Sequence, residues 1–169
     1  MTQDTGKKIA IMGSTGSIGT QALDIVRANK DRLRVEVLTA QNNADLLIKQ
    51  AIEFEPNAVV IADESKYKHV KEALDKHDIK VYAGADALSQ VVQMDSVDMV
   101  LAAIVGFAGL KSTLSAIEAG KPVALANKET LVVAGALVTE LAKQKGVNIY
   151  PVDSDHSAIF QCLAGEFHN

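Results

Sequence analysis

A glycine-rich segment near the start of the sequence carries its clearest chemical pattern, Gly13-Ser14-Thr15-Gly16-Ser17-Ile18-Gly19. It follows a short apolar run and precedes apolar residues at helical spacing, so it is predicted to turn from a strand into a helix. Gly13 permits a tight turn, Gly16 lets a pyrophosphate approach the backbone, and Gly19 lets the helix pack close to the strand. The helix N-terminus then offers free amides to phosphates. The pattern predicts dinucleotide binding, with a turn that binds nothing as the alternative; the GxxGxxG spacing is a relative of the strict GxGxxG fingerprint.

The end of the second predicted strand bears on which dinucleotide binds. NAD-specific domains usually carry Asp or Glu there, which hydrogen-bonds the ribose hydroxyls. Here the strand is followed by Gln41, Asn42 and Asn43, with no acid to repel a 2′-phosphate and no Lys or Arg to attract one. The missing acid favours NADPH. Asn43 is also the expected N-cap of the next helix.

Asn127, Lys128 and Glu129 lie where a predicted strand meets a predicted helix. Ligands of doubly wound sheets bind at the carboxyl ends of the strands, so these side chains are expected to point into a cofactor crevice. An ordinary helix start explains them equally well, with Asn127 as cap, Glu129 favourable in the first turn and Lys128 a solvated charge. Position alone leaves both interpretations open.

Asp153, Ser154 and Asp155 follow the last predicted strand, again at its carboxyl end. Acids at i and i+2 share one face of an extended chain. Two carboxylates flanking a hydroxyl suit a hard cation such as Mg²⁺ or Mn²⁺. An acidic polar turn is the alternative. A transition-metal site built on His156 is not expected, because the remaining histidines show no ligand spacing: His69, His77 and His168.

The single cysteine, Cys162, excludes an internal disulfide. Two interpretations exist for it. It could be a nucleophile, as in semialdehyde dehydrogenases, whose glycine turn is similar. A small buried hydrophobe in a helix-like segment is the favoured interpretation.

Strand and helix patterns alternate along the chain, which predicts an α/β fold with a Rossmann-type, doubly wound, mostly parallel sheet and helices on both faces. Strands are expected over residues 8–12, 34–39, 58–62, 79–82, 98–103, 121–126 and 147–150. The helix expected over residues 130–145 has an apolar stripe of Leu131, Ala134, Leu137, Val138 and Leu141. A domain boundary is expected after residue 150, where the alternation gives way to polar and acidic residues.

Composition supports this fold class. Of 169 residues, 48% are hydrophobic but only 4% aromatic, so Val, Ile, Leu and Ala must form the core, as in stacked βαβ units. The net charge of −4 argues against a nucleic-acid partner, which usually requires a basic surface. A polar start and the lack of a bilayer-length apolar run predict a cytoplasmic chain without a membrane partner.

Four segments together resemble the 1-deoxy-D-xylulose 5-phosphate reductoisomerase family, in order and over essentially the whole chain. The resemblance implies an NADPH- and metal-dependent enzyme that rearranges a sugar phosphate and then reduces it, giving 2-C-methyl-D-erythritol 4-phosphate. The segments are Gly13 to Gly19, Ala103-Ile104-Val105-Gly106-Phe107-Ala108-Gly109-Leu110, Ala126-Asn127-Lys128-Glu129, and Pro151 to His156 continuing through Ala158-Ile159-Phe160-Gln161.

The resemblance also implies site residues. Those for the NADPH pyrophosphate are Thr15, Gly16, Ser17 and Ile18, and those for the adenosine ribose and its phosphate are Gln41, Asn42 and Asn43. Asn127 and Glu129 contact the cofactor, Lys128, Ser154 and Asp155 the substrate, and Asp153 and Asp155 the metal; Lys128, Asp153 and Asp155 form the implied catalytic set. Two departures stand out, because many members have Gly and a basic residue in the loop 41–43 and Glu at the position of Asp155.

Family members continue well beyond the length of this sequence. We therefore expect residues 1–150 to be an NADPH-binding Rossmann domain and 151–169 to begin a catalytic domain, with a homodimer at full length. The chain alone is expected not to turn over substrate. Two alternatives stay open: another NAD(P)-dependent reductase such as a semialdehyde dehydrogenase, and a non-catalytic nucleotide-binding or dimerisation module.

Overall fold

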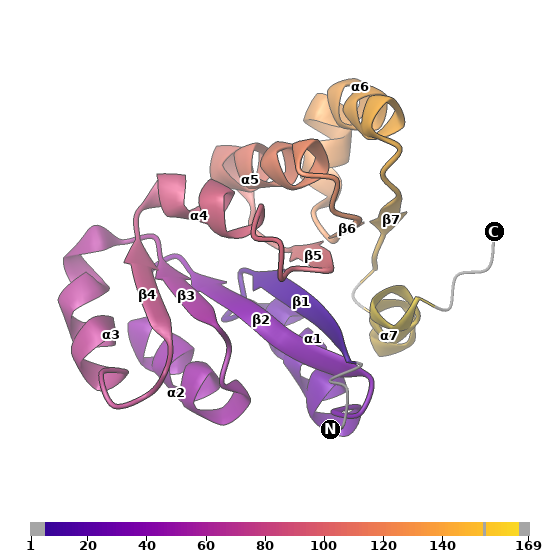
Figure 1. Cartoon of the computed structure of the whole chain (residues 1–169). Coiled ribbons are helices and arrows are strands. Elements are labelled where there is room, and N and C mark those ends of the chain that lie inside the picture. Colours follow the sequence, from indigo (N-terminus) through magenta and orange to yellow (C-terminus); the bar gives the residue numbers. More distant parts are fainter. Residues whose placement is uncertain (1–5, 154, 166–169) are drawn as a thin grey trace.

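The computed structural model describes residues 6–153 and 155–165, apart from the side chains of Lys128 and His156 (Figure 1). Within these residues one parallel sheet has the strand order β4-β3-β2-β1-β5-β6-β7. The chain moves outward from β1 to β4 and then crosses back to β5 on the other side of β1. The strands are β1 (Lys7–Met12), β2 (Leu33–Ala40), β3 (Ala58–Ile61), β4 (Lys80–Ala83), β5 (Met99–Ala102), β6 (Val123–Leu125) and β7 (Ile149–Pro151).

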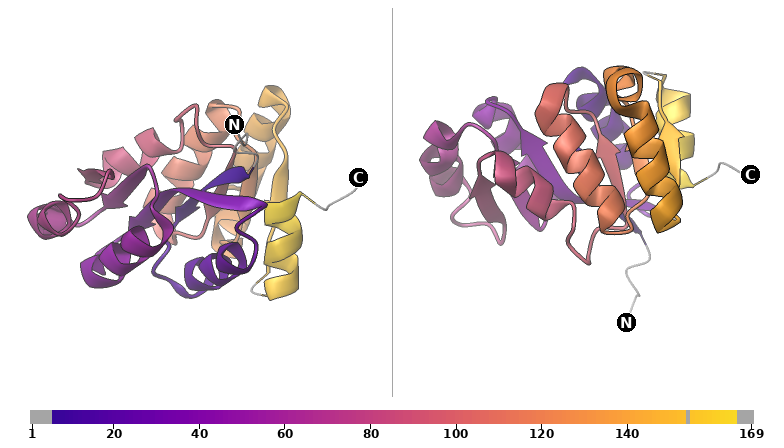
Figure 2. Two further views of the ribbon diagram at one scale, coloured as in Figure 1. Left: turned by 60° about the horizontal axis from the view of Figure 1, so that its bottom comes forward. Right: turned by 90° about the horizontal axis from the view of Figure 1, so that it is seen from above.

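Helices cover both faces of the sheet, as Figures 1 and 2 show. One face carries α1 (Ser17–Ala28), α2 (Ala44–Phe54), α3 (Tyr67–Ala73) and α7 (His156–Ala164), with the 3-10 turn η1 (Glu64–Lys66) leading into α3. The other face carries α4 (Ala85–Val91), α5 (Gly106–Glu118) and α6 (Lys128–Lys145). The predicted Rossmann-type, doubly wound fold is therefore confirmed, and every strand pair in it is parallel.

The core consists of two apolar layers separated by the sheet. In β1, Ile9 and Ile11 belong to the layer under α1 and α2, whereas Ala10 and Met12 belong to the layer under α4 and α5. All four are fully buried, because a central parallel strand is covered on both faces. This explains why the strand is continuously apolar from Ile9 to Met12 rather than alternating.

The apolar stripe predicted for the long helix is wrong at one position. Val138 is fully buried, but 54% of Leu137 is exposed. The helix is broken at Ala134, where φ −131° and ψ 20° lie outside the helical range. The other four predicted residues, Leu131, Ala134, Val138 and Leu141, all face the layer under α4 and α5, so the stripe continues past the break and Leu137 alone of the five lies outside it.

Helix α7 packs against α1 and buries Ile159, Cys162 and Leu163 in the same apolar layer as that helix. Residues on both sides of the predicted boundary at 150/151 thus share one core. The boundary itself stays a prediction.

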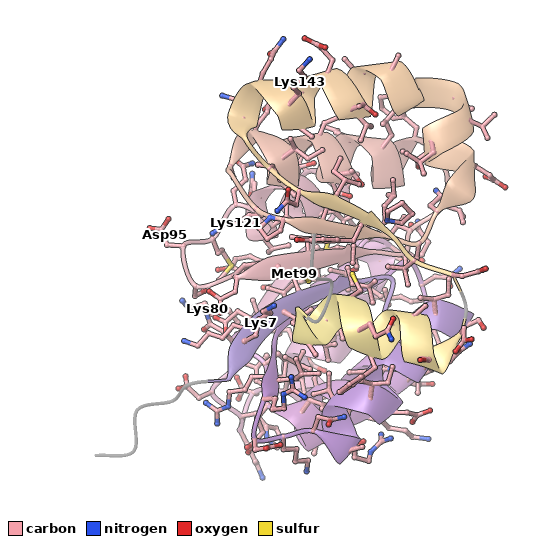
Figure 3. The ribbon with its side chains drawn as sticks, turned by 90° about the vertical axis from the view of Figure 1, so that its right-hand side faces the viewer. Lys7, Lys80, Asp95, Met99, Lys121 and Lys143 are labelled. Carbon is pink, nitrogen blue, oxygen red and sulfur yellow. The ribbon has the colours of Figure 1, made fainter. Side chains whose placement is uncertain are left out.

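The two edges of the sheet differ in what they carry. Figure 3 shows Lys7, Lys80 and Lys121 at the amino-terminal edge, the starting ends of the parallel strands. A hollow of about 320 Å³ there is lined by charges of both signs, among them Lys8 and Glu53, and it is far from the glycine turn. The opposite edge, where the strands end, carries the residues predicted to do chemistry.

Candidate dinucleotide site

The glycine turn has the geometry that its sequence predicts. Gly13 has φ +85°, a conformation that residues with a side chain rarely adopt. Gly19 lies so close to the turn that an added Cβ would come within 2.2 Å of the Gly13 carbonyl oxygen. Both glycines are therefore required by the fold, one by its backbone angle and the other by the approach of α1 to β1.

Gly16 has no such structural reason to be glycine. Its φ of −79° is open to any residue. A Cβ added there would meet its nearest heavy atom at 3.5 Å, an ordinary contact distance. The residue is exposed at the start of α1. Neither the backbone angle nor packing therefore requires glycine at this position, although glycine is also a favoured N-cap residue. The missing side chain leaves the backbone at the start of α1 accessible.

The start of α1 is uncapped. Gly16 is the N-cap residue and makes no side-chain hydrogen bond, whereas Asn43, Asn127 and Asp155 cap α2, α6 and α7 through their side-chain oxygens. Helices α3, α4 and α5 also begin without a side-chain cap, but none of them follows the glycine turn. The first turn of a helix has amides without an intrahelical partner. At α1 these amides and the positive end of the helix dipole are available to an anion.

A buried polar network, which the sequence analysis missed, holds this turn to α2. The Ser14 hydroxyl donates to Gln50 Oε1 (2.7 Å), and Gln50 Nε2 donates back to the Ser14 carbonyl (3.0 Å). The Gly13 and Ser14 amides donate to the hydroxyl and carbonyl oxygens of Thr39 (2.9 and 2.8 Å). Ser14, Thr39 and Gln50 are all buried. The turn is therefore fixed to the end of β2 before any ligand arrives.

A crevice opens beside the turn, at the carboxyl ends of β1, β2 and β5. It is a cavity of about 370 Å³ at the point where the strand order reverses, which is the usual ligand position in doubly wound sheets. Of the predicted residues, Thr15, Gly16 and Gln41 line it. The remaining lining residues are Gly13, Ala40, Ala62, Leu88, Ala103, Ile104 and Val105.

The predicted ribose loop is exposed at one end of this crevice. Gln41, Asn42 and Asn43 all follow β2 and are solvent-accessible. The Asn43 side chain accepts from the Leu46 amide (3.2 Å), which confirms its predicted role as N-cap of α2. Ser17 is also exposed, and Ile18 is half-buried against the core.

Asn127 connects the end of β6 to the crevice. Its Oδ1 accepts from the Glu129 amide (3.0 Å) and its Nδ2 donates to the Ile104 carbonyl (3.1 Å), so the expected helix cap is confirmed. Ile104 lies 3.4 Å from where a Gly13 Cβ would be, which places the segment close to the glycine turn. Glu129 is exposed. The side chain of Lys128 lies outside the described part of the structure.

The acidic pair lies at the end of β7. Asp153 and Asp155 are both exposed, and Asp155 caps α7 by accepting from the Ser157 amide (2.7 Å). Ser154, predicted between them, lies outside the described residues. Within the described part of the chain, no three His, Cys, Asp or Glu side chains are grouped to hold a metal. Two carboxylates fit a hard cation that keeps water and takes further oxygens from elsewhere.

Cys162 is the small buried hydrophobe that the sequence favours. Only 1% of it is exposed, within the layer between α7 and α1. Burial raises the pKa of its thiol to about 12. A neutral thiol is not a nucleophile, so the arrangement gives no support to a cysteine-dependent dehydrogenase.

The fold, the uncapped glycine turn and the crevice at the reversal of strand order define a dinucleotide-binding domain of the Rossmann type. The sequence matches the 1-deoxy-D-xylulose 5-phosphate reductoisomerase family over residues 9–135. The chain belongs to that family.

Individual relatives agree with this assignment. The reductoisomerase of Bacteroides fragilis is 60% identical over 163 residues, or 96% of this chain and 42% of that protein. The Zymomonas mobilis reductoisomerase in complex with NADPH has a TM-score of 0.85 and 46% identity, over 93% of this chain and 41% of that chain. A DOX-P reductoisomerase in complex with NADPH, fosmidomycin and magnesium has a TM-score of 0.84 and 42% identity, over 92% of this chain and 38% of that chain. The chain thus spans less than half of the relatives it matches.

No helix in the described part of the chain is both long and apolar enough to cross a bilayer.

Proposed function

We propose that this chain binds NADPH in the crevice beside the glycine turn. The observation that carries the proposal is Gly16, which is glycine for no reason of packing or backbone angle and lies at the uncapped start of α1. A pyrophosphate on this backbone would accept hydrogen bonds from the first α1 amides, next to Thr15, Ser17 and Ile18. The related structures that contain NADPH support the same cofactor.

The other predicted cofactor contacts follow the crevice along the sheet edge. Gln41, Asn42 and Asn43 are proposed to contact the adenosine ribose and its phosphate, because they are exposed where β2 ends. Asn127 and Glu129 are proposed to contact the cofactor at the other side. Asn127 would act mainly by holding the Ile104 carbonyl and the start of α6 in place, since both ends of its amide are already hydrogen-bonded.

The larger function proposed for the full-length protein is conversion of 1-deoxy-D-xylulose 5-phosphate to 2-C-methyl-D-erythritol 4-phosphate, in a homodimer. Bound Mg²⁺ or Mn²⁺ would polarise the substrate carbonyl, and bound NADPH would supply the hydride. In this chain, Asp153 and Asp155 would hold the metal and Lys128, Ser154 and Asp155 the substrate. The cytoplasm is the proposed compartment; a single cysteine is typical of chains from a reducing environment.

Calorimetric titration of this chain with NADPH and then NADH tests the proposal. We expect saturable binding of NADPH at one site and weaker binding of NADH. Failure to bind either dinucleotide would contradict the proposed function. Binding of the two dinucleotides with equal affinity would favour a general nucleotide-binding module.

A second measurement tests the whole-protein activity. With the sugar phosphate, Mn²⁺ and NADPH present, we expect no oxidation of NADPH by this chain, because no three His, Cys, Asp or Glu side chains of the described residues are grouped to hold the metal. Steady oxidation of NADPH would show that the active site is already complete.

A further inference from the structure

The loop predicted to meet the adenosine phosphate is bound by a lysine from a distant part of the sequence. Lys66 Nζ donates to the main-chain carbonyl of Asn42 at 2.6 Å, across 24 positions of the chain. Lys66 is half-buried, at the end of η1. A positive charge therefore lies directly against a loop, 41–43, that has no Lys or Arg of its own.

The sheet topology explains this contact. Strands β2 and β3 are parallel neighbours, and Ala40 pairs with Ile61 at their carboxyl ends. Beyond the strands, the Ala62 amide donates to the Ala40 carbonyl (2.9 Å) and the Asp63 amide to the Gln41 carbonyl (2.8 Å). The chain leaving β3 thus runs beside the chain leaving β2, and the tight turn of η1 brings the next lysine back over the loop.

The acids nearest to this lysine already have partners. The Asp63 carboxylate accepts from the Ser65 amide (3.0 Å) and the Ser65 hydroxyl (2.6 Å). The Asp45 carboxylate lies 2.8 Å from His69 Nε2. The hydrogen bond to His69 is the main cause that lowers the pKa of Asp45, and the charges of Lys49 and Lys66 lower it further. Lys49, Lys66 and His69 therefore all lie near the Asp45 carboxylate at the start of α2, and the charge of Lys66 also lowers the pKa of Asp63.

NADPH and NADH differ only by a phosphate on the adenosine 2′-oxygen, and in this fold that oxygen lies at the end of β2. A lysine ammonium group has three donors, so Lys66 can hold the Asn42 carbonyl and still donate to a phosphate oxygen. We propose that Lys66 is the residue through which this chain selects NADPH over NADH, by binding the 2′-phosphate. This inference rests on the proposed function, because it requires the dinucleotide to occupy the crevice.

The substitution Lys66→Gln, with Lys68→Gln as its matched control, tests the inference. Lys68 undergoes the same chemical change two positions away, but 86% of its side chain is exposed and its partner is Glu72 on α3. We expect Lys66→Gln to weaken NADPH binding by about tenfold or more, as for the loss of a charge-assisted hydrogen bond, and to leave NADH binding within about twofold. Lys68→Gln should change neither affinity, and Lys66→Arg should keep the preference for NADPH.

Adenosine 2′,5′-bisphosphate and AMP provide a second readout that loop geometry alone would not change. Binding of the bisphosphate should fall in Lys66→Gln, while binding of AMP should not. An equal loss for NADPH and NADH, or for both small probes, would overturn the inference, because Lys66 would then only hold the loop. An unchanged NADPH-to-NADH ratio would overturn it as well. If the unsubstituted chain binds neither dinucleotide, the proposed function fails first, and the two failures are thereby distinguished.

Discussion

A pair of glycine-to-alanine substitutions should separate ligand binding from folding within one turn. Gly16→Ala adds a methyl group whose nearest protein atom is 3.5 Å away, so the fold can accept it. Replacing Gly by Ala at an N-cap costs about 0.5–1 kcal/mol. The lower entropy of the unfolded chain offsets a similar amount. The melting temperature should therefore stay within about 3 °C of the unsubstituted chain.

The pyrophosphate site should respond much more strongly than the fold does. The new methyl group would occupy the space through which the phosphates reach the α1 amides. We expect the Kd for NADPH to rise at least about tenfold, equivalent to roughly 1.4 kcal/mol.

Gly19→Ala should instead affect the stability of the fold more than Gly16→Ala does. Its Cβ would be 2.2 Å from the Gly13 carbonyl oxygen and 2.6 Å from Ser14 Cα, and both atoms belong to the backbone. Helix α1 must then move by roughly 1 Å to restore ordinary contact distances. Overpacking of this kind costs about 3 kcal/mol or more, which lowers the melting temperature by roughly 6–12 °C.

Thermal unfolding and calorimetric titration with NADPH measure the two effects on the same samples. Gly135→Ala is the control, because a Cβ there meets no atom within 4 Å, and it should leave NADPH binding unchanged. If Gly16→Ala binds NADPH as tightly as the unsubstituted chain, the backbone at residue 16 is not where the phosphates lie. If Gly19→Ala is as stable as that chain, the close approach of α1 to the turn is not what requires glycine.

Three further predictions concern Gln50, Asn127 and Cys162. Gln50→Leu removes both hydrogen bonds to Ser14 and leaves the buried carbonyl of Ser14 without a donor. The free energy of unfolding should therefore fall by about 2–3 kcal/mol, and NADPH binding should weaken. An unchanged free energy of unfolding would contradict the network. Asn127→Ala removes the cap of α6 and the hydrogen bond to the Ile104 carbonyl, so the free energy of unfolding, measured by thermal unfolding, should fall by about 1–2 kcal/mol. Asn127→Asp, which keeps the oxygen that caps the helix, should recover part of this stability. Cys162 should resist thiol reagents in the folded chain up to about pH 9 and react on unfolding. Because burial raises the pKa of this thiol from 9.0 to about 12, its contribution to stability is complete below pH 9 and is lost as the pH rises toward 12, which unfolding curves over that range would show.

The sequence predicted the fold well because local patterns and tertiary packing agree over most of the chain. β1 is apolar without interruption from Ile9 to Met12 because it is covered on both faces there, and Asn43 caps α2 where its type and position indicate. The prediction failed at Leu137, which is 54% exposed although its spacing fits the stripe of α6. The rest of the predicted stripe faces the core on both sides of the break at Ala134, so hydrophobic spacing alone does not mark where the stripe ends.

Gln50 is a different kind of omission, because the sequence did contain a signal for it. It lies three residues after Leu47 and beside Ala51, on the buried stripe of α2. A polar residue at such a position is either costly or hydrogen-bonded. Its periodicity therefore indicated a buried partner, but only the structure could show that this partner is Ser14 in the phosphate turn.

Lys66 could not have been found by spacing at all. Dinucleotide recognition in this fold combines backbone amides and side chains, and a sequence pattern predicts the two unequally. The backbone amides that would bind the pyrophosphate can be predicted from the glycines that leave room for it. A side-chain cation for the 2′-phosphate needs only to reach the end of β2, and any segment leaving a neighbouring strand can deliver it. The pairing of β2 with β3 brings Lys66 to Asn42, so the proposed preference for NADPH depends on which strands are neighbours and not on the loop sequence alone.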